Sequence, residues 1–207
     1  MKNASSEARP RGRPRAFDRD EALGQAALAF WRLGYEGASI ADLTQAMGIT
    51  AQSLYAAFGS KAALYREALD WYRGVARAGA ARAMAQEPDV ITGFGNMLVE
   101  TARDFSRPGE PPGCMISTAV LACATENQEV ARHVAALRSG ATALFRTRIG
   151  AGIAAGQLRA DTDSEALARF LAAIVQGMSV QARDGADEVA LLGIARLAQA
   201  ELERHRA

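Results

Sequence analysis

Apolar residues recur with a helical period along most of the chain, and no segment alternates apolar and polar residues as a half-buried strand would. Residues that cap helices, and glycines that end them, divide this pattern into short pieces in the first third of the chain. It predicts a helix from Asp18 to Gly34, a second from Ser39 to Gly48, a third from Thr50 to Gly59 and a longer fourth from Ser60, which carries Trp71 and Tyr72.

Longer helices are predicted beyond Pro88. The apolar period indicates a helix over about 89–106, whereas residues 107–113, RPGEPPG, must form a loop because proline interrupts a helix. A helix or helix pair is expected from Cys114 to about Gly156, another from Asp161 or Asp163 to about Arg183, and a last one over 187–204. The fold class is therefore all-α, with about nine helices.

Composition excludes several classes of protein. The 207 residues are 49% hydrophobic, as in globular proteins, and no apolar run approaches the ~18 residues of a membrane helix. The basic N-terminus has no apolar segment behind it, so we expect a cytoplasmic protein without a signal peptide. With two cysteines and two histidines, the chain shows no zinc-binding spacing, and we expect no metal and no cofactor.

Positive charge is concentrated at the N-terminus. Residues 1–19 hold six basic and two acidic side chains, although the whole chain carries a net charge of only +1. Within this arm, Arg11, Arg13 and Arg15 alternate with Gly12 and Pro14 in the sequence RGRPR. Such an extended arm fits the narrow minor groove of A/T-rich DNA. A solvated tail would have the same composition, and it is the segment that follows that favours DNA.

Residues 39–58, SIADLTQAMGITAQSLYAAF, have the pattern of a helix-turn-helix, with Gly48 at the turn. The second helix is too short to be stable alone, and its polar face carries no acidic residue. On this face Gln52 can bond adenine, while Thr50, Ser53, Tyr55 and Lys61 can donate to phosphate oxygens. A helical hairpin within a bundle is the alternative interpretation.

Two stretches carry a resemblance to a known family: the arm GRPR and the segment ALAFWRLGYEGASIADLTQAMGITAQSLYAAFGSKAALYREAL. Together they resemble TetR/AcrR repressors over about residues 11–70. The resemblance implies that the third helix recognises DNA, with Ala51, Gln52, Ser53 and Tyr55 at its DNA-facing positions. It also implies phosphate contacts at Ser39 and Lys61. One departure is Thr44, which stands where helix-turn-helix sequences usually have alanine.

The resemblance further implies a basic arm (1–16), a DNA-binding domain (17–63) and an effector-binding and dimerisation domain (64–207). The last two helices of that domain are expected to pair with those of a second copy in a four-helix bundle. Their apolar stripes would equally fit the core of one protomer. The residues assigned to the interface are Leu167, Phe170, Leu171, Ile174, Leu191, Ile194 and Ala198.

A pocket for a small molecule is also implied, between about residues 70 and 180. The candidate wall residues are Trp71, Phe94, Met97, Phe105, Cys114, Met115, Phe145 and Met178. Cys114 is expected at a helix start, where the helix dipole would favour a reactive thiolate; a small buried residue is the plainer interpretation. Cys123, nine residues on, would be too far away along one helix for a disulfide.

The expected function is a dimeric repressor that a small molecule releases from double-stranded operator DNA. A sensor of oxidants or electrophiles that acts through Cys114 is the alternative within this class. A helical enzyme would need a convergent catalytic set, and the sequence offers none. A protein-binding adaptor would not need RGRPR beside a helix-turn-helix. The sequence does not specify the operator, the effector, the regulated genes or whether transcription is repressed or activated.

Overall fold

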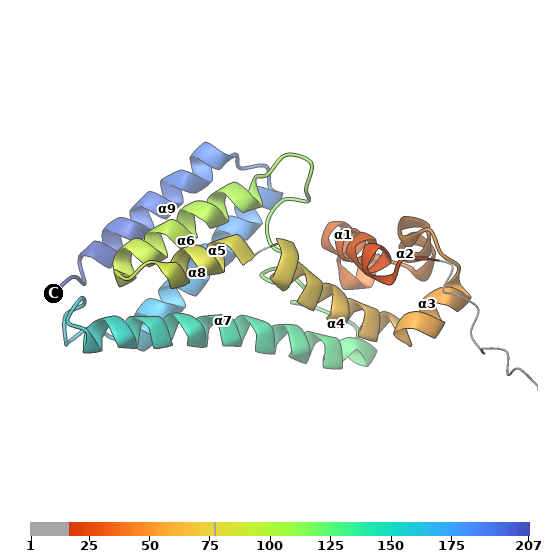
Figure 1. Cartoon of the computed structure of the whole chain (residues 1–207), viewed down its shortest axis with the longest axis horizontal. Helices are drawn as coiled ribbons and strands as arrows, with labels where there is room; N and C mark the ends of the chain where they lie inside the picture. The colour runs from red at the N-terminus through yellow and green to blue at the C-terminus, as the bar shows by residue number, and fades with distance from the viewer. Residues whose placement is uncertain (1–16, 77) are drawn as a thin grey trace, which may run out of the picture.

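The computed structural model describes residues 17–76 and 78–207, which form nine α-helices and no β-strand (Figure 1). The all-α fold class is confirmed. None of the helices in this part of the chain combines the length and the apolarity needed to cross a bilayer. The α-helices are α1 (Arg19–Gly37), α2 (Ile40–Met47), α3 (Ala51–Phe58), α4 (Lys61–Trp71), α5 (Ala78–Gln86), α6 (Val90–Phe105), α7 (Gln128–Ala154), α8 (Ser164–Arg183) and α9 (Glu188–Glu203).

Helices α1–α4 form a head at one end of the molecule (Figure 1). Their predicted starts are confirmed, because Asp18, Ser39, Thr50 and Ser60 each accept a hydrogen bond from a free amide of the first turn. At Gly34, the predicted end of the first helix, the backbone leaves the helical conformation (φ 75°, ψ 171°) and kinks α1, and one further turn continues beyond the kink to Gly37.

Helices α5–α9 form a body with a hydrophobic core of its own. Helix α6 packs against α5 and α9, and α8 packs against α7 and α9. Aspartate side chains cap three of these helices: Asp89 at α6, Asp163 at α8 and Asp187 at α9. The predicted helices over 89–106 and 187–204 and the helix that ends at Arg183 are confirmed within one or two residues.

The segment from Cys114 to Ala124 corrects the sequence-based expectation, because it forms turns rather than the start of a helix. A 3₁₀ turn follows at Thr125–Asn127, and α7 begins only at Gln128. Tertiary contacts replace the helical hydrogen bonds here. Arg138 of α7 donates to the carbonyls of Ile116 and Ala119, and Ser179 of α8 accepts from the amide of Cys114.

The fourth helix is also shorter than expected. It ends at Trp71, and Tyr72–Ala76 continue as one π-helical turn, η1, before α5. Tyr72 therefore lies on η1 and not on α4. A π-turn holds extra backbone within one turn and is often found at functional sites.

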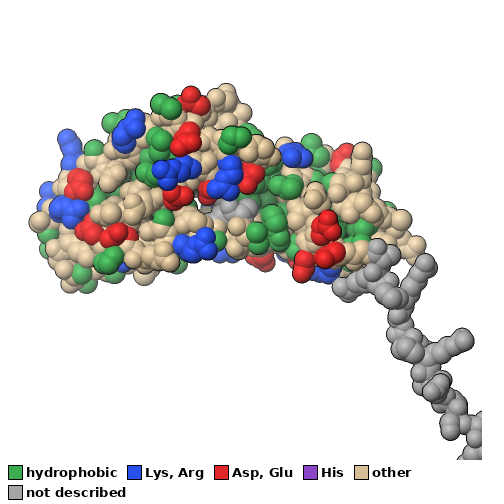
Figure 2. All heavy atoms as spheres, turned by 45° about the horizontal axis from the view of Figure 1, so that its top comes forward, with side chains coloured by type: hydrophobic (Ala, Val, Ile, Leu, Met, Phe, Trp, Pro, Cys, Tyr) green, Lys and Arg blue, Asp and Glu red, His purple; other side chains and the backbone are tan. Residues whose placement is uncertain are grey.

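The head and the body are joined by side chains from both. Met115 from the turn segment, and Val130 and Val134 from α7, are buried in the same hydrophobic cluster as the head helices. Figure 2 shows hydrophobic side chains gathered where the head meets the body. The predicted domain boundary after residue 63 falls inside α4, which packs along α1.

Candidate DNA interface and ligand cavity

Helices α2 and α3 are joined by a tight turn at Gly48, whose left-handed backbone (φ 65°, ψ 28°) glycine adopts without steric cost. Leu43 from α2 and Leu54 from α3 are fully buried, and Ile40 and Ile49 pack beside them, half-buried. This is the predicted helix-turn-helix arrangement, held to the head through the same core. The short α3 is therefore fixed by packing on one side and exposed on the other.

Thr44 fits this arrangement in spite of its extra bulk. Its hydroxyl donates to the carbonyl of Ile40 at 2.9 Å and lies 3.0 Å from the carbonyl of Ala41, both in the preceding turn of α2. The polar group is thus satisfied within its own helix. Its hydroxyl therefore needs no hydrogen-bond partner on α3.

The outer side of α3 presents small and polar side chains. Ala51, Gln52 and Tyr55 are exposed, and Ser53 is half-buried. Thr50 caps the helix through the amide of Ser53 and also donates to the hydroxyl of Ser53 at 3.0 Å. No acidic residue lies on α3, so this face can approach phosphates without like-charge repulsion.

The residues beside α3 that are predicted to contact phosphates, Ser39 and Lys61, each interact with another side chain of the protein. The hydroxyl of Ser39 donates to the carboxylate of Asp42 at 2.6 Å, and the amide of Ser39 donates to the same carboxylate. These two hydrogen bonds lower the pKa of Asp42. The ammonium of Lys61 lies 4.6 Å from the centre of the Tyr35 ring, and burial lowers the pKa of Lys61. Their phosphate contacts therefore stay predictions. So do those of Arg11, Arg13 and Arg15, which lie outside the described residues.

A cavity of about 620 Å³ lies between η1, α5–α8 and the turn segment that begins at Cys114. This volume is in the range of small-molecule sites. Most of its wall is apolar, with Met84, Met97 and Phe145 among the lining residues. Tyr72 also lines it, and its ring packs edge-on against Trp31 of α1 with the centroids 5.0 Å apart. The cavity thus touches a residue in direct contact with the head.

The eight candidate pocket residues separate into two groups. Met97, Phe105, Cys114 and Phe145 line the cavity. The other four lie elsewhere: Phe94 and Met178 are fully buried in the core of the body, Met115 is buried in the core of the head, and Trp71 packs against Gly24 of α1. Sequence reasoning missed Arg138 and Gln176, whose polar side chains line the cavity. Their helices gave no signal, because a polar residue on a helix is normally on its solvent side.

Cys114 connects the parts of this site. It is half-buried, lines the cavity and packs against both the head core and the body core. Its sulfur accepts a hydrogen bond from the amide of Ile116 at 3.4 Å. The expectation that it begins a helix is wrong, so the helix-dipole argument for its reactivity does not hold. Gly113 before it lies so close to α8 that a Cβ there would stand 2.5 Å from the carbonyl oxygen of Ser179.

The stripes on α8 and α9 also separate into two groups. Leu167, Leu171, Leu191 and Ala198 are buried in the protomer's own core. Phe170, Ile174 and Ile194 are half-exposed and line a mainly apolar groove between the two helices, to which Leu167 and Ala198 also contribute. Leu197, which sequence reasoning missed, lines the same groove and is 74% exposed. Its position three residues after Ile194 was the available signal.

Among the described residues, no group of three His, Cys, Asp or Glu side chains is placed to hold a metal ion.

Comparison with known proteins gives one consistent family. Residues 23–68 match the bacterial regulatory proteins of the tetR family, and residues 96–196 match the tetracyclin repressor-like C-terminal domain. The chain is 33% identical to the HTH-type transcriptional repressor ComR of Escherichia coli K12, covering 89% of each chain. It is 31% identical to the repressor BdcR of the same organism, covering 84% of this chain and 83% of BdcR.

A solved structure of the TetR family regulator CifR agrees closely with this fold. It is a cysteine mutant in complex with 26-base-pair double-strand operator DNA. The identity is 44%, the TM-score is 0.88, and the match covers 91% of this chain and 98% of that one. A TetR regulator from Rhodococcus sp. RHA1 is 38% identical over 90% of this chain and 98% of its own, with a TM-score of 0.61. The chain belongs to the TetR family of bacterial transcriptional regulators.

Proposed function

We propose that this protein is a homodimeric repressor that binds operator DNA through α3 and leaves it when a small molecule fills the cavity between η1, α5–α8 and the turn segment. The observation that carries the DNA-binding half is the exposed, acid-free face of α3 on a fixed helix-turn-helix. CifR, whose backbone is closely similar, was solved on operator DNA. On this chain Gln52 would contact a base edge, while Thr50 and Tyr55 would contact phosphates.

The DNA-binding half is tested by selecting operator sequences from random DNA with the purified protein. A dimer with two recognition helices should recover a palindrome whose half-sites are about one DNA turn, ~34–36 Å, apart. Recovery of no preferred sequence, at a salt concentration where the protein stays folded, would contradict the proposal.

The release half rests on the position of the cavity. A ligand there would press on Tyr72, which packs against Trp31 in the head, and on the turn segment whose Met115 belongs to the head core. The ligand need not contact DNA, because it has only to bind the DNA-incompetent orientation of the heads more tightly. By linkage, operator DNA must then weaken ligand binding by the same factor, about 5–150-fold.

A second candidate is a sensor of electrophiles or oxidants that acts through Cys114. The observation in its favour is that this sulfur lines the cavity and contacts both hydrophobic cores, so that a group added there would push them apart. Treatment with an alkylating agent should then release DNA from the wild type but not from Cys114→Ser. Cys123→Ser is the matched control and should respond like the wild type.

A further inference from the structure

Among the described residues, the charged side chains on the cavity wall are two arginines, Arg73 and Arg138, and one aspartate, Asp104. The carboxylate of Asp104 is buried and pairs with the guanidinium of Arg107. Arg73 has a 54% exposed side chain and lies 3.8 Å from the carboxylate of Asp70, so solvent screens its charge. Arg138 is left as a half-buried cation with no carboxylate within ion-pair distance among the described residues.

Arg138 is held in place by two neutral groups. Its Nη1 donates to the carbonyl oxygens of Ile116 at 3.1 Å and Ala119 at 2.9 Å. Carbonyls orient a guanidinium but do not neutralise its charge. Both bonds leave from one nitrogen of a side chain with five N–H donors, so that Nε and Nη2 donate to no group in the described part of the protein and can bind a ligand. A carboxylate fits the edge that these two atoms form with a pair of parallel hydrogen bonds.

We infer that the effector is an organic anion, a carboxylate or similar acid on a mainly apolar skeleton, and that Arg138 binds its acidic group. This inference rests on the proposed function, in which the cavity is the effector site. The apolar wall suits the skeleton, with Met97, Phe105 and Phe145 nearest the body core. Thr101 and Gln176 offer hydrogen bonds to further polar atoms.

The same residue places the anion in contact with the head. The carbonyls that Arg138 holds belong to the turn segment, in which Ile116, Ala119 and Val120 pack against the head core. Val120 has φ 49°, a conformation that a β-branched residue adopts only when its surroundings impose it. An anion that draws the guanidinium toward the cavity weakens two of the bonds that impose it. The binding of an anion in the cavity is thereby transmitted to the head.

The test uses the full-length protein and probes that differ only in charge. Phenylalkanoates of several chain lengths are compared with the matched primary amides and amines by thermal shift and calorimetry. We expect the best carboxylate to bind about 10- to 100-fold more tightly than its amide, with the amine weakest. Equal binding of amide or amine, or no binding by any carboxylate of the series, would overturn the inference.

Variants assign the effect to one residue. Arg138→Gln should remove the preference for carboxylate over amide, and Arg138→Lys should keep part of it because the charge remains without the fork. Arg73→Gln is the matched control and should keep the preference. If Arg138→Gln does not fold, the wild-type comparison and Arg138→Lys still decide. A full preference in Arg138→Lys and Arg138→Gln would place the anion elsewhere.

Operator binding by the ligand-free protein separates this inference from the proposed function. If that binding is absent, the proposed function fails. If the protein binds its operator and the amides release it as well as the carboxylates do, only the inference about the anion fails.

Discussion

Arg183, the last residue of α8, donates a hydrogen bond from Nη2 to the main-chain carbonyl of Trp31 in α1 at 2.9 Å. The acceptor lies one turn before the kink at Gly34, where the backbone of α1 departs from helical φ and ψ. The ring of the same tryptophan contacts Tyr72 of the cavity wall. Trp31 of the head thus contacts both the body, through Arg183, and a residue of the cavity wall, Tyr72.

Loss of this bond should weaken operator binding without unfolding the protein. In Arg183→Gln the head is held less firmly in the orientation that DNA requires, so a smaller fraction of the protein is competent to bind. A bond of about 1 kcal/mol corresponds to a loss of roughly 3- to 10-fold in operator affinity, measurable by fluorescence anisotropy. Arg169→Gln is the matched control and should bind like the wild type, because Arg169 lies on the same helix and pairs with Glu165, one turn before it on α8. Equal affinity of both variants would show that the bond does not orient the head.

The head was predictable from sequence because its determinants are local. Each of the first four helices begins at a capping side chain, and Gly48 and Gly59 end two of them within a few residues in sequence. The turn segment that begins at Cys114 was not predictable from sequence. Arg138 of α7 donates hydrogen bonds to two of its carbonyls, and Ser179 of α8 accepts one from the amide of Cys114. Those partners are far away in sequence and are brought near only by the fold.

The cavity was predictable in part for a related reason. Helix α6 is buried on most of its circumference, so the helical period identifies its apolar residues but not the side that faces the cavity. Met97 and Phe105 line the cavity, whereas Phe94 on the same helix packs in the core. The same ambiguity affects α8, where Leu171 and Ile174 were both assigned to the predicted interface. Leu171 is fully buried in the protomer, whereas Ile174 is half-exposed.

Operator binding should depend steeply on salt. A dimer that neutralises about 6–10 phosphates should lose roughly 10³-fold or more in affinity between about 50 and 200 mM salt, because counterions are released on binding. Deletion of residues 1–15 should weaken binding to every sequence and make this dependence shallower. An unchanged slope after the deletion would mean that Arg11, Arg13 and Arg15 are not in the groove.

Gln52 should determine part of the base preference. Gln52→Ala should cost about 1–3 kcal/mol on the preferred operator and relax the choice of base in each half-site, since the amide can bond two edge atoms of adenine. The measurement is a competition series with single-base variants of the operator. Gln45→Ala, at an exposed position on α2, is the control and should change neither affinity nor preference. Unchanged preference in Gln52→Ala would assign base recognition to other residues of α3.

The groove between α8 and α9 should be the dimer interface. Leu197→Glu changes a side chain that is 74% exposed in one protomer, so the protomer should fold while the dimer dissociates, because a charge would be buried at the interface. Sedimentation velocity and the melting temperature measure the two effects. Leu121→Glu, at a residue that is 71% exposed in the turn segment, should remain dimeric. A stable Leu197→Glu dimer would place the interface elsewhere. Leu171 is unsuitable for this test, since a polar group there would disrupt the protomer.

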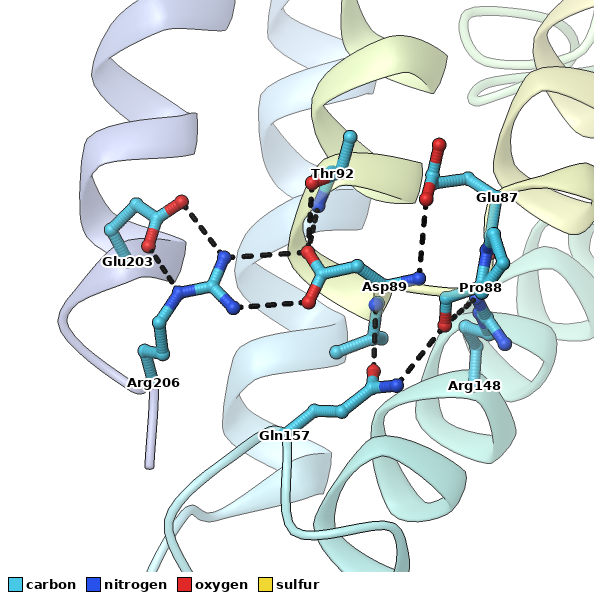
Figure 3. A network of polar contacts seen from close by, with 9 residues as sticks. Glu87, Pro88, Asp89, Thr92, Arg148, Gln157, Glu203 and Arg206 are labelled. Atoms are coloured by element: carbon cyan, nitrogen blue, oxygen red, sulfur yellow. Dashed lines mark hydrogen bonds and ion pairs between the residues drawn. The ribbon is translucent and has the colours of Figure 1, made fainter.

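Asp89 and Arg206 tie the C-terminus to the start of α6 (Figure 3). The guanidinium lies 3.0 Å from Oδ2 of Asp89 and also pairs with Glu203. The carboxylate accepts hydrogen bonds from the amide and hydroxyl of Thr92 as well. The bonds from Arg206, and then those from Thr92, hold the pKa of Asp89 well below its ordinary value of 3.8.

This lowered pKa predicts a stability that depends on pH. A carboxylate whose pKa is lower in the folded state stabilises the fold above its unfolded pKa, and the contribution is lost as the pH falls through the folded pKa. Asp89→Asn keeps a side chain that can cap α6 but removes the charge. We expect the variant to be less stable than the wild type by about 1 kcal/mol near neutral pH, a figure reduced for solvent screening at a partly exposed pair. The difference should shrink as the pH falls below about 4, because Asp89 of the unfolded chain then takes up a proton while the folded carboxylate, whose pKa is lower, still holds its charge. Urea unfolding at a fixed protomer concentration measures this difference, since dimer stability depends on concentration.

Asp161→Asn is the control. The carboxylate of Asp161, which pairs with Arg159, is 75% exposed, so this ion pair should contribute nothing measurable at either pH. A difference between Asp89→Asn and the wild type that stays constant down to acid pH would mean that the contribution of Asp89 comes from helix capping or packing and not from its charge.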